Sequence, residues 1–237
     1  MYQIIYELES LFWYQKSILY RKRLLLANGH PGNTVESNLG GYSVRAMIDK
    51  GILFIHIPKC AGTAVNTSLY NCLGGGHLRA LDYRRMLGVE AYEKIHKFTV
   101  MRDPWERLYS AYRHLRGNAE RSVEIKNLQL RRIVDLDFEG FVGGLDRKLI
   151  FLSELVLKPQ YLFITPSFKP CQLLVDQIYT QAQISEVISN YGGHFSNRIN
   201  ASGAPFNKDD IYSETLLNRV RELYPEDVKL YNQIHSS

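Results

Sequence analysis

The chain has 237 residues and a formal net charge of +5, with 45% hydrophobic and 22% charged residues. These proportions are typical of a globular domain and exclude a disordered chain. The basic excess suits an anionic ligand but is too small to indicate a nucleic-acid partner by itself. Three cysteines, Cys60, Cys72 and Cys171, are too few for a disulfide framework and favour a reducing, cytoplasmic compartment.

Residues 1–42 are expected to form an amphipathic helix and a loop packed on a body of residues 43–237, within a single-domain protein. Charged side chains interrupt every apolar run, so no stretch approaches the roughly 18 to 20 apolar residues that span a bilayer. No basic start leads into a signal-peptide core. A peripheral contact of this helix with a membrane surface is the alternative.

Strands that alternate with helices predict an α/β domain with a mostly parallel sheet. The first unit is a buried strand over 52–57, a turn over 58–62 and a helix over 63–73 that Thr63 caps and glycines 74–76 stop. A strand over 97–101 leads into a helix that starts at Asp103-Pro104 and runs to about Leu115. Further strands are predicted over 160–165 and 173–179, and further helices over 184–191, 213–224 and 225–234.

The turn after the first strand, Pro-Lys-Cys-Ala-Gly-Thr-Ala, carries residue types that bind anions. Backbone N–H groups at a helix start attract an anion, and ligands bind at the carboxyl edge of a parallel sheet. Gly62 allows close backbone approach, Thr63 offers a hydroxyl and Lys59 offers a charge. The lysine precedes the glycine, so this is not a GxxxxGK[ST] loop, and an ATP-dependent kinase is excluded. A plain strand-to-helix turn is the alternative.

The second strand–helix junction, Arg-Asp-Pro-Trp-Glu-Arg-Leu-Tyr-Ser-Ala-Tyr, places Arg102 at the strand end and Ser110 on the following helix. A guanidinium suits phosphate oxygens, and Arg107 shares a helix face with Ser110. Either Arg102 and Ser110 bind one phosphate, or Arg102, Asp103 and Arg107 form a structural charge network.

Taken together, the two segments resemble the donor-binding motifs of sulfotransferases that use 3′-phosphoadenosine 5′-phosphosulfate (PAPS). PKCAGTA resembles the 5′-phosphosulfate loop, and RDPWERLYSAY resembles the 3′-phosphate motif R-D-P-x-x-R-x-x-S-x-Y. The similarity is greatest to the carbohydrate branch, with its heparan-sulfate 2-O-sulfotransferase-like enzymes. It is weaker in KPQYLFI (158–164), VDQIYTQAQISEVI (175–188), RINAS (198–202) and LYPEDVKLYNQI (223–234). The resemblance implies a P-loop-like three-layer α/β domain whose central, mostly parallel sheet is flanked by helices.

The resemblance also implies roles for the residues of both motifs. Lys59 would be catalytic, as the cation at the leaving bridging oxygen. Arg102 and Ser110 would hold the 3′-phosphate, and no metal would be required. The 5′-phosphate would be held by the loop and the first helical turn, that is by Lys59, Cys60, Ala61, Gly62, Thr63 and Ala64. Cys60 is expected to contribute its backbone and not to act as a nucleophile.

A hydroxyl acceptor benefits from a general base, and His77 is the preferred candidate. It follows three glycines, and GGGHLRALDYRRMLG (74–88) resembles the segment that carries the catalytic histidine in the 2-O-sulfotransferase-like branch. Asp82 or Glu106 is the alternative base. His56 is expected to be structural, inside the first strand. Arg79, Arg84 and Arg85 either hold an anionic acceptor or form a solvated helix face.

The sequence therefore predicts a PAPS-dependent sulfotransferase that acts on a hydroxyl of a carbohydrate or polysaccharide. A small secondary metabolite is the alternative acceptor. An inactive nucleotide- or nucleic-acid-binding module is the alternative from another class, and the joint presence of Lys59, His77, Arg102 and Ser110 argues against it.

Overall fold

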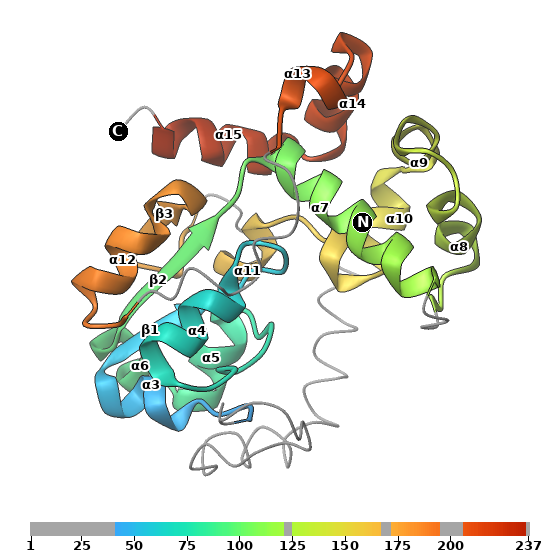
Figure 1. Cartoon of the computed structure of the whole chain (residues 1–237). Helices are drawn as coiled ribbons and strands as arrows, with labels where there is room; N and C mark the ends of the chain where they lie inside the picture. Colours follow the sequence, from blue (N-terminus) through green and yellow to red (C-terminus); the bar gives the residue numbers. More distant parts are fainter. Residues whose placement is uncertain (1–40, 121–124, 167–171, 195–205, 236–237) are drawn as a thin grey trace.

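The computed structural model describes residues 41–120, 125–166, 172–194 and 206–235 (Figure 1). It has an α/β fold with a small, open, three-stranded parallel sheet and flanking helices. The elements in chain order are α3 (Arg45–Lys50), β1 (Ile52–Ile55), α4 (Gly62–Tyr70), α5 (Ala80–Leu87), α6 (Val89–Lys94), β2 (His96–Met101), α7 (Pro104–Glu120), α8 (Leu128–Val134), α9 (Phe138–Gly144), α10 (Arg147–Leu152), η1 (Leu155–Leu157), α11 (Tyr161–Ile164), β3 (Gln177–Thr180), η2 (Gln181–Gln183), α12 (Ile184–Asn190), α13 (Lys208–Ile211), α14 (Glu214–Leu223) and α15 (Pro225–His235).

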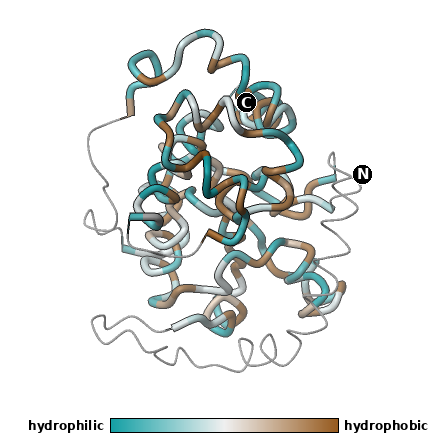
Figure 2. The backbone as a smooth tube through the Cα atoms, turned by 90° about the vertical axis from the view of Figure 1, so that its right-hand side faces the viewer, coloured by the Kyte–Doolittle hydropathy of each residue, from teal (hydrophilic) through white to brown (hydrophobic). Residues whose placement is uncertain are grey.

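The predicted N-terminal helix lies outside the described residues. Hydrophobic and hydrophilic residues are interspersed along the described chain (Figure 2). Within the ranges given above, no helix is both long enough and apolar enough to cross a bilayer.

The sheet has the order β1-β2-β3, and both pairings are parallel, as predicted. Ile52 lies opposite His96 in the first pairing, and Phe98 lies opposite Gln177 in the second. β1 and β2 are buried over almost their full length, as expected of strands covered on both faces. Parallel strands place their carboxyl ends at one edge, so the β1–α4 loop and the β2–α7 junction leave the sheet side by side.

Helix α7 packs into one of the two parts of the hydrophobic core. Its start follows the prediction, because the Asp103 carboxylate accepts hydrogen bonds from the backbone N–H groups of Trp105 (2.8 Å) and Glu106 (3.1 Å). One face of α7 packs in a hydrophobic cluster with the C-terminal helices, through Trp105, Leu108 and Tyr112. A second hydrophobic cluster surrounds the sheet. The other face of α7 is free to carry polar side chains to the sheet edge.

The predicted strand over 160–165 is wrong, because Tyr161–Ile164 forms the short helix α11. All four residues are buried, and a short apolar run buried on every side does not distinguish a strand from a helix. The Asp227 carboxylate on α15 fixes the helix start by accepting hydrogen bonds from the backbone N–H groups of Gln160 (2.7 Å) and Tyr161 (2.9 Å). This contact joins residues that are far apart in the sequence.

The first predicted helix is also shifted. α4 begins at Gly62 and ends at Tyr70, so Thr63 is not its cap and the glycines at 74–76 do not stop it. Ala61 precedes the helix in the left-handed conformation, and Asn71 follows it in the same conformation. The Thr63 hydroxyl is therefore not used as a helix cap.

Candidate functional site

The β1–α4 loop contains two residues in the left-handed conformation that are not glycine. Lys59 has a φ of 67° and Ala61 a φ of 56°, a conformation that costs an L-residue roughly 1–2 kcal/mol. The second junction holds the loop in this shape. Arg107 donates from Nε to the Pro58 carbonyl (3.0 Å), and Arg102 donates to the Lys59 carbonyl (3.2 Å). The two predicted motifs are thus bonded to each other.

Arg107 has a structural place and not a ligand-binding one. Only 3% of it is exposed, and its second hydrogen bond runs to the Lys158 carbonyl (2.9 Å). It therefore ties the β1–α4 loop to the segment before α11. The sequence predicts a structural charge network as the alternative for this arginine. Arg107 does have a structural role, but its hydrogen-bond partners are backbone carbonyls and not carboxylates.

The start of α4 is a helix end without a side-chain cap. The first four N–H groups of a helix have no partner within it, and here they belong to Ala61, Gly62, Thr63 and Ala64. These four residues all line one cavity. Cys60 differs from them, because its backbone N–H donates to the Ile57 carbonyl (3.3 Å) and it does not line the cavity.

Cys60 is a buried free thiol. Burial raises its pKa to about 11, and its Sγ lies 3.2 Å from the Gln160 side-chain oxygen. The same Gln160 amide accepts from the Arg102 backbone N–H (3.1 Å) and donates to the Arg102 carbonyl (2.9 Å). Gln160 thus connects the β1–α4 loop to the β2–α7 junction without lining the cavity.

Arg102 reaches the cavity from the end of β2. It pairs with Glu106 at 2.6 Å, and its Nε is buried without a hydrogen-bond partner among the described residues. The Arg102 guanidinium lines the cavity and is a charged donor group that suits an anionic ligand. Ser110 lines the same cavity from α7.

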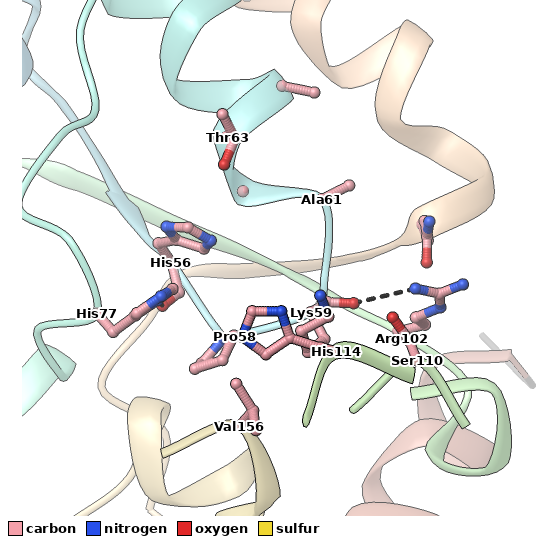
Figure 3. Close-up of a pocket in the computed structure, with 13 residues that line it drawn as sticks. His56, Pro58, Lys59, Ala61, Thr63, His77, Arg102, Ser110, His114 and Val156 are labelled. Atoms are coloured by element: carbon pink, nitrogen blue, oxygen red, sulfur yellow. Dashed lines mark hydrogen bonds between the residues drawn. The ribbon is translucent and has the colours of Figure 1, made fainter. Parts of the chain in front are cut away.

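Lys59 lines the cavity beside Arg102, and His77 lines it from the opposite side (Figure 3). Burial, with Arg102 and Arg107 next in effect, lowers the pKa of Lys59. The His77 ring is accessible to solvent, yet the protein atoms around it, with smaller contributions from Arg107 and Lys59, lower its pKa. His77 Nδ1 lies 3.4 Å from the His56 carbonyl oxygen, which accepts if this nitrogen carries the proton. The Nε2 lone pair is then available as a base.

The cavity has a volume of about 400 Å³. Among the described residues, it is lined by His56, Pro58, Lys59, Ala61, Gly62, Thr63, Ala64, His77, Arg102, Ser110, His114, Val156 and Gln181. This set holds two cations and three histidines but no carboxylate. Together with the uncapped helix start, it suits a ligand with negative charge at more than one point.

Several predicted residues do not reach this cavity. Asp82 pairs with the buried Arg79 at 3.1 Å, and Glu106 pairs with Arg102, so neither alternative base lines it. Arg84 pairs with Glu93 on the neighbouring helix. The described site therefore favours His77 among the candidate bases and gives no support to acceptor binding by Arg79.

Two histidines of the cavity escaped the sequence argument. His56 follows β1 instead of lying inside it, and its ring lines the cavity. His114 lies four residues after Ser110 on α7, a spacing that places both on one helix face, so the sequence held a usable signal for it. Val156 of η1 and Gln181 of η2 come from segments without such a signal.

The chain matches no protein-family model, no curated protein and no solved structure. Within the described ranges, no group of three or more His, Cys, Asp or Glu side chains is placed to hold a metal ion.

Proposed function

We propose that the protein is a PAPS-dependent sulfotransferase that transfers a sulfuryl group to a hydroxyl of a carbohydrate, on a P-loop-like α/β domain. One observation carries the proposal: a single cavity gathers Lys59, the uncapped start of α4, Arg102 with Ser110, and His77. These are the residues of both motifs and the preferred base, which come from three separate segments of the chain.

The chemistry of the cavity fits this donor, which carries a phosphosulfate at one end of its ribose and a 3′-phosphate at the other. The N–H groups at the α4 start and the Thr63 hydroxyl would hold the 5′-phosphate. Arg102, whose Nε lacks a partner among the described residues, and Ser110 would hold the 3′-phosphate. These two residues would let the protein distinguish PAPS from nucleotides that lack the 3′-phosphate.

Transfer is an in-line displacement at sulfur. The acceptor oxygen forms a bond to sulfur while the bond from sulfur to the bridging oxygen of the 5′-phosphate breaks. The hydroxyl proton passes to His77 Nε2, and 3′-phosphoadenosine 5′-phosphate (PAP) leaves with the bridging-oxygen electrons. Lys59 stabilises the charge that develops on that oxygen, as preorganised cations do in related group transfers.

The lowered pKa of His77 supports its role as the base. A base must be unprotonated at the working pH, and desolvation of this imidazole by the surrounding protein, with smaller contributions from Arg107 and Lys59, disfavours its protonated form. The carbohydrate acceptor rests on the sequence resemblance to the 2-O-sulfotransferase-like branch.

Transfer of sulfur label from PAPS to a panel of glycans and small hydroxyl compounds tests the proposal. We expect label in a glycan product with the wild-type protein and almost none with Lys59→Ala. If only a small metabolite became labelled, the proposed sulfuryl transfer would stand but the acceptor would be a metabolite and not a glycan. Tight binding of PAP without transfer to any acceptor would instead favour the inactive nucleotide-binding module.

A further inference from the structure

His56 lies between the start of α4 and His77, at the inner wall of the cavity (Figure 3). Its ring and that of His77 have centroids 4.3 Å apart. A Cβ atom on residue 62 would overlap the Cδ2 and Nε2 atoms of His56, so this ring packs directly against the glycine backbone. The absence of a side chain at Gly62 therefore has a steric role: it leaves room for the His56 imidazole at the start of the helix.

The two ring nitrogens of His56 have different surroundings. Nδ1 is buried and has no hydrogen-bond partner among the described residues, whereas the Nε2 edge borders Gly62. Burial, and then the charge of His77, lower the pKa of His56 to about 3, so the ring is neutral near pH 7. A neutral imidazole has one N–H, and a proton on Nδ1 would bury a donor without an acceptor. Buried N–H donors without a partner are rarer in proteins than buried acceptors without one, so we assign the lone pair to Nδ1 and the proton to Nε2, at the edge that borders Gly62.

We propose that His56 is a further ligand-binding residue of the site, whose neutral Nε2–H donates to the anionic group held at the start of α4. If the proposed function is correct, this anionic group is the phosphosulfate of PAPS. His56 adds a hydrogen bond there without adding a positive charge beside Lys59. Its backbone carbonyl accepts from His77 Nδ1–H and so keeps the Nε2 lone pair of His77 free for the acceptor proton.

Two variants separate donation from packing. His56→Phe keeps a ring against Gly62 but has no N–H, and His56→Gln returns an amide N–H near the place of Nε2. The backbone carbonyl that orients His77 is present in both. We expect His56→Phe to slow single-turnover transfer from PAPS about 10- to 100-fold, the usual effect of losing a hydrogen bond to a charged group, and His56→Gln to recover much of the loss. A wild-type rate in His56→Phe would reduce His56 to a packing residue and overturn the proposal.

A second readout does not depend on transfer. Nitrogen–proton correlation spectra of the imidazoles should show His56 as the neutral Nε2–H tautomer near pH 7, with a resonance that shifts when inorganic sulfate is added. His56→Phe should bind sulfate about 10-fold more weakly than the wild type. An Nδ1–H tautomer, or a His56 resonance that does not respond to sulfate, would refute the assignment even if His56→Phe failed to fold. The wild-type protein could show the predicted tautomer and sulfate response and yet fail to bind PAP. That result would contradict PAPS as the donor but not the anion-binding role of His56.

Discussion

Substitution of Gly62 by alanine tests the packing at the centre of the site. The added Cβ would lie closer than 3.0 Å to ring atoms of His56, well inside the roughly 3.5–4.0 Å at which carbon atoms attract. Since Gly62 has an ordinary helical conformation, the cost comes from this overlap and not from backbone strain. Overpacking of this kind costs about 1–3 kcal/mol, which lowers Tm by about 2–12 °C in a chain of this size. Thermal and denaturant unfolding measure this loss.

The cause can be isolated with a double-mutant cycle. In a His56→Ala background the ring is gone, so Gly62→Ala should cost much less than it does in the wild type. Gly117→Ala on α7 is a matched control, because its new Cβ meets nothing within 4 Å, and we expect it to stabilise the helix by about 0.5–1 kcal/mol. An equal cost of Gly62→Ala with and without the His56 ring would refute the proposed packing.

Three further predictions concern catalysis and pH. Lys59→Ala should lower the single-turnover transfer rate about 10²- to 10³-fold, while calorimetry should show that PAP still binds through Arg102; an unchanged rate would remove Lys59 from the leaving-group role. His77→Ala should lower the rate about 10²- to 10⁴-fold with little change in PAPS affinity, and the wild-type rate should stay level down to about pH 6.5 and fall only below it, because the pKa of this base is lowered. An acid limb above pH 6.5 would contradict that assignment. Burial raises the pKa of Asp227 from 3.8 to about 6, so its contribution to stability is full below about pH 4 and is lost as the pH rises through 6. Urea unfolding should therefore show Asp227→Asn gaining up to about 3 kcal/mol relative to the wild type between about pH 4 and pH 7, and a difference that does not change with pH would contradict the raised pKa.

The strongest predictions from the sequence concern local signals. The buried strands before each motif and the Asp103-Pro104 helix start each depend on neighbouring residues, and the structure confirms them. The cavity also brings together Lys59 and Arg102, which the motifs placed after two neighbouring parallel strands. Parallel pairing alone is enough to make the loops that follow such strands meet.

The errors came from contacts between distant segments. Whether 161–164 forms a strand or a helix depends on Asp227, 66 residues beyond Tyr161. Asp82 is an exception, because it pairs with Arg79 only three residues earlier in the capping box of α5. His56 had an apolar sequence context that indicated a core position, and only its packing against Gly62 places its ring at the cavity.

Calorimetric titration with PAP and with adenosine 5′-phosphate tests the donor site most directly, because it needs no knowledge of the acceptor. With Arg102 and Ser110 holding the 3′-phosphate, PAP should bind at least about 10-fold more tightly, as expected for a hydrogen bond to a charged group. Arg102→Met should abolish most of this preference, and the exposed pair variant Arg45→Met should not. Equal affinity of the wild-type protein for the two nucleotides, or a preference that survives in Arg102→Met, would contradict the assignment of this cavity as a PAPS site.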